Sequence, residues 1–196
     1  MHIVFASANK NKIQEISALI PSTYILVSLE DIGITEDIPE TGLTIKDNSE
    51  IKARYVAEIL IKKNLPWAVI ADDSGLEVEA LNGEPGVYSA RYAGIQKNDT
   101  ANNKKLLDEL AKYTNRKAIF VTTITLILNN QIFFFNGEIN GTIALQPKGI
   151  KGFGYDPLFI PQGYQSTFAE LEKDVKNKIS HRAIALKKVI QYLNKI

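Results

Sequence analysis

Residues 67–76 read WAVIADDSGL, an apolar run that leads directly into two adjacent carboxylates. The run from Trp67 to Ala71 shows no alternation of apolar and polar residues, so we expect a strand with both of its faces covered. Such strands occur in sheets that carry helices on both sides, which predicts an α/β fold. Apolar residues also recur at helical spacing in four segments: 10–20, from Thr44 to about 63, 99–113 and 181–193.

The remaining segments predict further strands and the turns between them. Short strands are expected at 2–6 and 24–29, and two long ones at 118–128 and 131–144. Asn129-Asn130 is typical of a hairpin turn, while Gly75 and the Gly83–Gly86 stretch indicate turns after the central strand. Thr44, three residues before Asp47, is a capping-box signature. The sheet is therefore predicted to be mixed.

Bulk properties exclude some classes of protein. A chain of 196 residues predicts one domain, 1–196, or two tightly joined lobes. The formal net charge of +1 argues against a nucleic-acid coat or a membrane-surface protein. No cysteine is present, which excludes disulfides, thiolate metal sites and thiol nucleophiles. No signal peptide or apolar run of about 20 residues is visible, so we expect a cytoplasmic protein.

The adjacent carboxylates of Asp72 and Asp73 are the first candidate site. Neighbouring strand residues point to opposite faces, so at most one of them is expected to face a given cleft. Ligands in α/β sheets bind beyond the carboxyl ends of strands, where Mg²⁺ would neutralise a carboxylate. We expect Asp72 to brace the turn that follows the strand. The alternative is that both aspartates are structural.

Two further segments resemble phosphate-binding elements. SANKNK, residues 7–12, joins a strand to a helix and offers Ser7, Asn9 and Lys12 beside free helix N–H groups. An ordinary N-cap with a solvated lysine is the alternative, and no P-loop pattern is present. Asn48 and Lys52 stand one turn apart on the next helix, and we expect Lys52 near its first turn, facing a second phosphate.

The C-terminal third holds candidates for contacts with a base. His181 and Arg182 follow Ser180 at a predicted helix N-terminus, where the helix dipole disfavours cations, which suggests a ligand acceptor there. A solvent-exposed pair is the alternative. Phe153 and Tyr155 lie in the glycine-rich loop KGFGYDP, where their rings would stack on a base or anchor the loop in the core.

These segments occur together and in this order in a known family. SANKNK, ETGLTIKDNSEIKA, ADDSGLEVEALNGEPGVYSARYAG, GFGYDP and SHRAIAL resemble the motifs of the inosine triphosphate pyrophosphatase family along nearly the whole chain. The resemblance implies an elongated two-lobed α/β fold with a mixed central sheet flanked by helices, a substrate cleft between the lobes, and a homodimer. Neither a nucleic-acid nor a membrane partner is expected.

The resemblance also implies a role for each matching residue. Glu40 and Asp73 would hold Mg²⁺, and Asp73 would also accept a proton, with Asp72 and Asn48 in support. The residues expected to hold the triphosphate are Ser7, Asn9, Lys12 and Lys52, and Ala8, Lys10 and Asn11 are expected to bind substrate beside them. Those expected to contact other parts of the substrate and its base are Ser74, Phe153, Gly154, Tyr155, Asp156, Lys176, His181 and Arg182.

The implied activity is hydrolysis of ITP, dITP or XTP to the monophosphate and pyrophosphate. Donors at His181 and Arg182 would suit the 6-oxo group of hypoxanthine or xanthine and would repel the 6-amino group of adenine. The alternatives are a pyrophosphatase for modified pyrimidine nucleotides and a nucleotide sensor without turnover. Ala8 and Lys151 stand where many relatives have Gly, so a positive φ at Ala8 would be strained.

Overall fold

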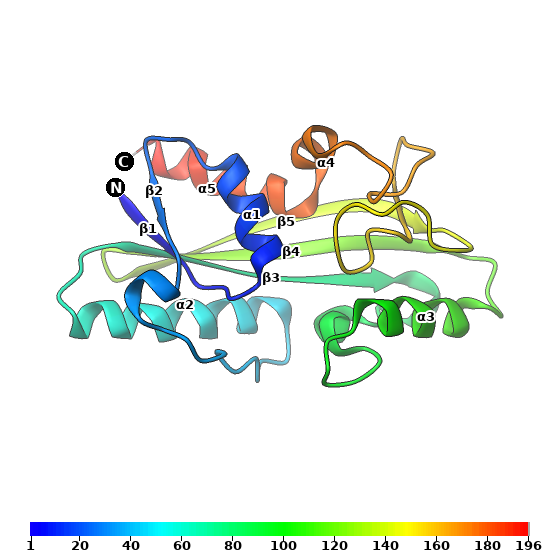
Figure 1. The fold of residues 1–196 in the computed structure, drawn as a ribbon, viewed down its shortest axis with the longest axis horizontal. Coiled ribbons are helices and arrows are strands. Elements are labelled where there is room, and N and C mark those ends of the chain that lie inside the picture. The colour runs from blue at the N-terminus through cyan, green and yellow to red at the C-terminus, as the bar shows by residue number, and fades with distance from the viewer. Residues whose placement is uncertain (196) are drawn as a thin grey trace. The chain divides into compact units, whose positions relative to one another are not determined.

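The computed structural model describes residues 1–195, which form an α/β fold (Figure 1). The strands are β1 (His2–Phe5), β2 (Ile25–Val27), β3 (Ala68–Val78), β4 (Lys117–Leu128), β5 (Gln131–Ile143) and β6 (Phe159–Pro161). The α-helices are α1 (Lys10–Leu19), α2 (Ile45–Lys62), α3 (Asp99–Leu110), α4 (Lys173–Ile179) and α5 (His181–Leu193). Three short 3-10 helices cover Glu30–Ile32, Glu79–Leu81 and Gly86–Arg91.

The six strands lie in the order β2-β1-β3-β4-β5-β6. β1 pairs in parallel with β2 and β3, whereas β6 pairs antiparallel with β5. The predicted mixed sheet is therefore confirmed. By its internal contacts the chain divides into two compact units. Unit 1 comprises Met1–Asp73, Thr122–Gly137 and the chain from Arg182 on, and unit 2 comprises Ser74–Val121 and Glu138–His181.

Unit 1 has a covered strand layer with a separate apolar core on each face. Val4 and Val69 pack in the core that contains Val56 and Leu60 of α2, whereas their neighbours Ile3 and Ile70 pack in the other core. That second core includes Ile16 of α1 together with Leu186 and Val189 of α5. Figure 1 shows α2 on one side of these strands and α1 with α5 on the other. The absence of alternation at 67–71 is thereby explained, because both faces are covered.

Unit 2 has one core of its own, built around the later part of β3 and the first part of β4. Leu76 and Val78 pack there with Leu106 and Leu110 of α3. Aromatic side chains fill the rest of this core, and among them the rings of Phe120, Phe159 and Phe168 contact one another.

Several local predictions are confirmed, and three are wrong. Thr44 and Asp47 form the predicted capping box, and Asn129 and Asn130 turn the β4–β5 hairpin with φ of 50° and 61°. β3 does not end at Ala71, however: it continues through both aspartates and Gly75 to Val78, so Gly75 makes no turn. Lys52 lies two turns into α2 rather than in its first turn.

One strand, one α-helix and the three 3-10 helices were not predicted. α4 and β6 are short, and the apolar periodicity of a three-residue strand is too brief to recognise. The single domain 1–196 and the substrate cleft stay predictions.

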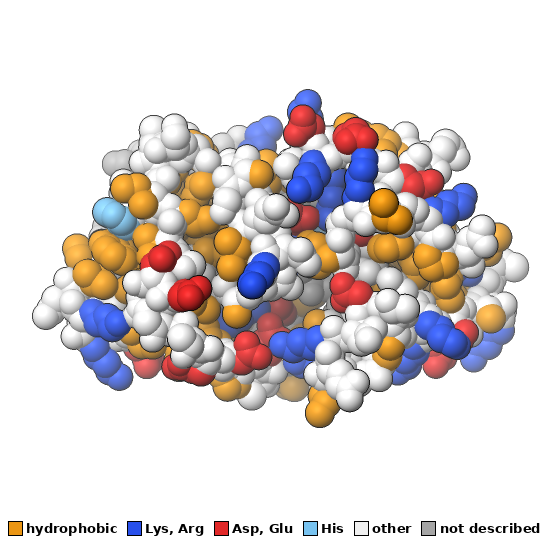
Figure 2. All heavy atoms as spheres, in the orientation of Figure 1, with side chains coloured by type: hydrophobic (Ala, Val, Ile, Leu, Met, Phe, Trp, Pro, Cys, Tyr) orange, Lys and Arg blue, Asp and Glu red, His pale blue; other side chains and the backbone are white. Residues whose placement is uncertain are grey.

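None of the helices formed by residues 1–195 combines the length and the apolar character needed to cross a membrane. Figure 2 shows a face on which basic and acidic side chains are interspersed, in keeping with a net charge of +1.

Candidate active site

Asp72 and Asp73 point to opposite faces of β3, as the alternation of a strand requires. Asp72 lies on the same face of β3 as Ala68 and Ile70, and its carboxylate contacts residues of α1 and α5. Asp73 lies on the same face of β3 as Val69, and its carboxylate pairs with Lys52 of α2. The expectation of opposite faces is confirmed. The role given to Asp72 in a turn is wrong, because the strand continues past it.

Asp72 is fully buried between two cations. Lys12 Nζ lies 3.1 Å from Asp72 Oδ2, and Arg182 Nε donates to the same oxygen at 2.9 Å. Burial alone would raise the pKa of Asp72, but Lys12 and Arg182 outweigh it and hold that pKa well below its usual range. Arg182 also pairs with Glu15 of α1. Burial would lower the pKa of Arg182, but the charges of Asp72 and Glu15 raise it.

These carboxylates account for the placement of Arg182 at a helix N-terminus. The guanidinium is 2% exposed and donates through Nε and Nη1 to partners inside unit 1. Its charge is therefore compensated without a ligand carbonyl. Its expected contact with a base stays a prediction. Sequence reasoning missed Glu15, although its position three residues after Lys12 on α1 places both on one helix face.

Lys52 joins the two carboxylates that the sequence predicts to hold a metal. Its Nζ lies 2.9 Å from Glu40 Oε1 and 3.1 Å from Asp73 Oδ1. Burial would lower the pKa of Lys52, but Asp73 and Glu40 outweigh it, so that pKa lies above its ordinary value. Two carboxylates thus converge on one buried positive charge.

This donor set fits a hard divalent cation that is completed by a substrate. Among residues 1–195, no group of three or more His, Cys, Asp or Glu side chains is arranged to hold a metal ion. Mg²⁺ is commonly held by one or two carboxylates together with phosphate oxygens and waters, rather than by a cage made only of protein. Glu40 and Asp73 supply such a pair, and Lys52 marks where a cation is stabilised between them.

The loop that carries Glu40 is fastened to the start of α2. Gly42 N donates to Asn48 Oδ1 at 2.8 Å. A Cβ on Gly42 would lie 2.6 Å from Asp47 Cβ and 2.8 Å from Asn48 N, so the loop approaches the helix too closely for any other residue. The buried Nδ2 of Asn48 has no hydrogen-bond partner among the described residues. Asn48 thus supports Glu40 through the backbone.

The SANKNK segment caps α1. Asn9 Oδ1 accepts from Asn11 N at 3.0 Å and from Lys12 N at 3.2 Å, and Asn9 N donates to Ser7 Oγ. The N-cap alternative is therefore confirmed for Asn9.

Lys12 is not a freely solvated lysine, since it pairs with Asp72. Burial lowers the pKa of Lys12, although the charge of Asp72 opposes this effect. Ala8 and Lys151 are not among the residues with positive φ, so the strain expected at Ala8 is absent.

In unit 2 the glycine-rich loop is organised around the buried Asp156. Its Oδ2 accepts from Phe153 N at 2.8 Å and from Lys176 Nζ at 2.5 Å. Gly152 has a φ of 76°, and a Cβ there would lie 2.0 Å from Asp156 Oδ2. Lys176 Nζ also lies 5.2 Å from the centre of the half-buried Phe153 ring. Phe153, Asp156 and Lys176 are thereby brought together.

The other predicted base contacts in unit 2 have different surroundings. Tyr155 is 4% exposed and donates from its hydroxyl to Ser89 O at 2.9 Å, so it is a core anchor of the loop. Burial raises the pKa of Tyr155 well above its usual range. His181 stacks on Phe120, with ring centres 4.6 Å apart and planes at 7°. Ser74 is half-buried within β3.

Comparison with known proteins matches this arrangement to one family. Residues 3–192 match the model of the Ham1 family. The chain is 50% identical over 195 residues to the dITP/XTP pyrophosphatase of Christiangramia forsetii, with all of both chains covered. It is 50% identical over 192 residues to the protein of that name from Flavobacterium psychrophilum, with 98% of each chain covered.

Solved structures agree with the sequence matches. The Ham1 protein of Staphylococcus aureus superposes with a TM-score of 0.87 and 41% identity, covering 100% of this chain and 99% of that one. A HAM1 protein from Coxiella burnetii gives a TM-score of 0.89 at 37% identity, with both chains fully covered. Because the family model spans nearly the whole chain and relatives are half identical to it along their full length, this chain belongs to the Ham1 family.

Proposed function

We propose that this protein hydrolyses non-canonical purine nucleoside triphosphates, dITP, ITP and XTP, to the monophosphate and pyrophosphate. The observation that carries the proposal is the convergence of Glu40 and Asp73 on Lys52 in a chain that matches the Ham1 family over residues 3–192. Relatives that are half identical along their whole length bear the name dITP/XTP pyrophosphatase.

The cations of unit 1 are suited to a polyphosphate. Lys12 and Lys52 each reach a carboxylate in the structure, at 3.1 Å and 2.9 Å. Phosphate oxygens are stronger competitors for such donors because each phosphate carries negative charge on several oxygens. We assign the ammonium groups of Lys12 and Lys52, together with the SANKNK segment, to the triphosphate. Nucleotidyl chemistry needs this positioning and charge more than a covalent nucleophile.

Glu40 and Asp73 are the residues assigned to hold Mg²⁺. Bound there, Mg²⁺ would neutralise phosphate charge and polarise the anhydride between the α- and β-phosphates. Asp73 is further assigned as the acceptor of a proton from the attacking water, through a carboxylate oxygen. Asp72 keeps the strand in place through Lys12 and Arg182, and Asn48 keeps the Glu40 loop against α2.

Unit 2 supplies the contacts for the base. Phe153 offers an aromatic face for stacking, and its backbone is held by Asp156. Lys176 is a buried donor beside that ring and, with His181, is suited to the 6-oxo acceptor of hypoxanthine and xanthine. The 6-amino group of adenine would place a donor against donors, so dATP should be rejected.

A substrate panel tests the proposal. The purified protein is incubated with MgCl₂ and dITP, XTP, dGTP, dATP or dUTP, and both pyrophosphate and orthophosphate are measured. We expect pyrophosphate with dITP and XTP, and far less with dATP. Release of orthophosphate, a preference for the pyrimidine, or tight dITP binding without turnover would each contradict the proposal.

Metal, assembly and location belong to the same proposal. We infer a Mg²⁺-dependent homodimer of the cytoplasm that has neither a nucleic-acid nor a membrane partner. The supports are the carboxylate pair, the family resemblance and the near-neutral net charge. Dialysis against EDTA followed by readdition of MgCl₂ tests whether activity depends on the metal. Light scattering coupled to size-exclusion chromatography tests the oligomeric state, and a monomer at working concentration would refute the homodimer.

A further inference from the structure

Side chains of helix α3 form hydrogen bonds to the backbone of one residue in the glycine-rich loop of unit 2. Gly154 N donates to Asp99 Oδ2 at 2.7 Å, and Asn103 Nδ2 donates to Gly154 O at 3.0 Å. Asp99 and Asn103 stand four positions apart on α3, so both face the loop from the same side of the helix. We call these two residues the α3 clamp.

The two hydrogen bonds of the α3 clamp fix different peptide planes. The N–H of Gly154 belongs to the peptide shared with Phe153, and its C=O belongs to the peptide shared with Tyr155. Together the two planes define φ and ψ of Gly154, whose φ is 61°. Glycine has the widest backbone freedom of any residue, so without such bonds this is the position where the loop would bend most readily.

The residues on either side show what the fixed backbone controls. Tyr155 is already immobilised, because its ring is buried and its hydroxyl donates to Ser89 O. Phe153 is half-buried; its N–H donates to Asp156 Oδ2, its C=O accepts from Asp156 N at 3.2 Å, and its ring lies beside Lys176. Gly154 links these two held residues, so its conformation contributes to the direction in which the Phe153 ring leaves the turn.

The buried side chain of Asn103 is not explained by a contribution to stability alone. It is 8% exposed, and its Oδ1 has no hydrogen-bond partner among the described residues. A buried amide with an unsatisfied oxygen destabilises a fold, whereas an apolar side chain of the same size would not. In the neighbouring Asn102 both ends of the amide are hydrogen-bonded: Oδ1 accepts from Ala93 N at 2.7 Å, and Nδ2 donates to Ala90 O at 3.0 Å.

We propose that Asp99 and Asn103 are positioning residues for the base, which act by fixing φ and ψ of Gly154 and thereby the ring of Phe153. This inference rests on the proposed function, and it assigns the two residues no contact with substrate. It requires that loss of the clamp weakens base binding while phosphate binding and the chemical step remain.

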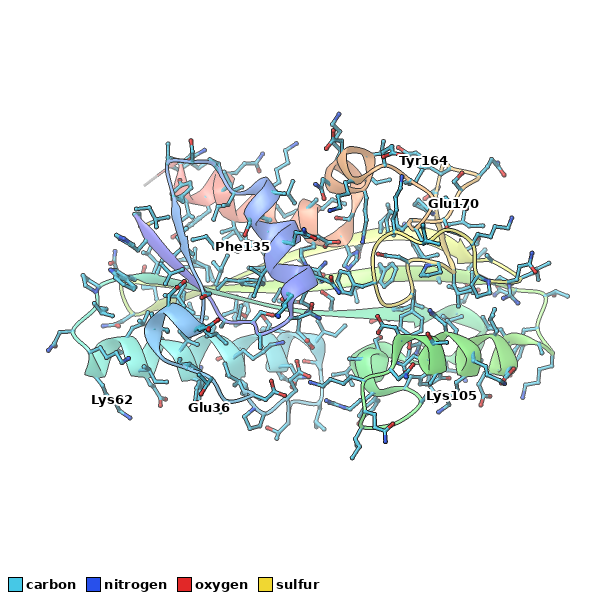
Figure 3. All side chains as sticks on the ribbon, in the orientation of Figure 1. Glu36, Lys62, Lys105, Phe135, Tyr164 and Glu170 are labelled. Atoms are coloured by element: carbon cyan, nitrogen blue, oxygen red, sulfur yellow. The ribbon has the colours of Figure 1, made fainter. Side chains whose placement is uncertain are left out.

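Asn103→Leu and Asn102→Leu form a matched pair of variants. Both replace a buried asparagine of α3 by a helix-forming residue of similar size, and Asn102 makes more hydrogen bonds than Asn103. On the same helix, Lys105 also contacts the segment near Ala93, donating to Tyr92 O at 2.8 Å (Figure 3). If the effect were general destabilisation, Asn102→Leu should show it at least as strongly.

For Asn103→Leu we expect KM for dITP to rise by up to about tenfold, a ceiling set by what one hydrogen bond contributes to holding Gly154 in place, with kcat little changed. Binding of dIMP, measured by calorimetry, should weaken by a similar factor, while binding of pyrophosphate stays as in the wild type. Asn102→Leu should lower Tm and leave KM for dITP unchanged. Equal rises in KM for both variants, or a loss confined to kcat, would overturn the inference.

Asp99 gives a second and independent arm, because it is exposed and its replacement should not endanger folding. Asp99→Asn keeps an acceptor for Gly154 N and should stay near wild-type KM, whereas Asp99→Ala should raise it. Equal large rises in both would contradict the acceptor role. Hydrogen exchange of residues 152–156 should quicken in Asp99→Ala and Asn103→Leu even if dITP is not a substrate, so failure of the inference and failure of the proposed function are distinguishable.

Discussion

Each unit of the molecule buries one lysine against an aspartate, and the two pairs differ in their surroundings. Lys52 and Asp73 in unit 1 are 6% and 7% exposed, and Lys176 and Asp156 in unit 2 are 7% and 2% exposed. Around Lys52 the neighbours are charged, with Glu40 as a second carboxylate. Around Lys176 they are aromatic, because the rings of Phe153 and Phe168 lie 5.2 and 5.5 Å from its Nζ.

We expect this difference in surroundings to give the two ion pairs different functions. A lysine among carboxylates can exchange one anionic partner for another, which suits a phosphate or a metal–phosphate complex. A lysine beside aromatic faces presents its charge and N–H donors in a flat apolar setting, which suits the edge of a base stacked on the ring. We therefore expect substitutions in unit 1 to affect all nucleotides alike, and substitutions in unit 2 to depend on the base.

The largest effect is expected for Asp73→Asn. Loss of a proton acceptor typically costs about 10²–10⁴ in rate, so kcat for dITP should fall by at least about a hundredfold, equally for XTP, while dITP still binds. Pyrophosphate release and calorimetry measure the two quantities. Glu79→Gln, at an exposed carboxylate just after β3, is the control. Near-normal kcat in Asp73→Asn would remove Asp73 from the mechanism.

Lys52→Ala should come next. A charge-assisted hydrogen bond is worth about 1.5–3 kcal/mol, so kcat/KM should fall by roughly one to two decades for every triphosphate tested. Lys46→Ala is a matched control on the same helix, since Lys46 is exposed and lies over the Phe134 ring. Should dIMP binding weaken as much as triphosphate turnover, Lys52 would not be a phosphate ligand.

Phe153→Leu is expected to have a smaller effect, of a different kind. Stacking of a base on an aromatic ring contributes about 1–3 kcal/mol, part of which leucine retains, so KM for dITP should rise by roughly fivefold to tenfold. The measure is KM for dITP and XTP beside the affinity for pyrophosphate, which should not change. Tyr164→Leu, on a half-exposed ring elsewhere in unit 2, serves as the control. A fall in kcat with KM unchanged would place Phe153 outside the base contact.

The smallest effect on activity is expected for Arg182→Lys. Lysine keeps the charge that pairs with Asp72 and Glu15 but cannot reproduce the bonds from both Nε and Nη1, so the free energy of unfolding should fall by about 1–3 kcal/mol. The ratio of kcat/KM for dITP to that for dATP should stay within about twofold, well under the tenfold that 1.4 kcal/mol would give. A selective loss with dITP would instead support the predicted contact of Arg182 with the base and contradict the division between the units.

Local patterns in the sequence were enough for most of the helices and strands, although not for α4 and β6. The Thr44–Asp47 capping box, the Asn129-Asn130 turn and the apolar periodicity of α2 and α5 each depend on residues within a few positions, so propensity and spacing predict them. Glu40 and Asp156 were identified from the resemblance of their motifs to a known family, whereas the opposite faces of Asp72 and Asp73 follow from strand geometry.

Only the tertiary structure decided which partner each of those groups has. Arg182 and Asp72 are 110 positions apart, and Asn103 and Gly154 are 51 apart. No local pattern encodes such pairings, because they arise from the packing of α5 and α3 against other parts of the chain. The same reason explains the turn wrongly expected after Ala71: Gly75 breaks an isolated strand, but β3 continues through it where neighbouring strands and buried cores support both ends.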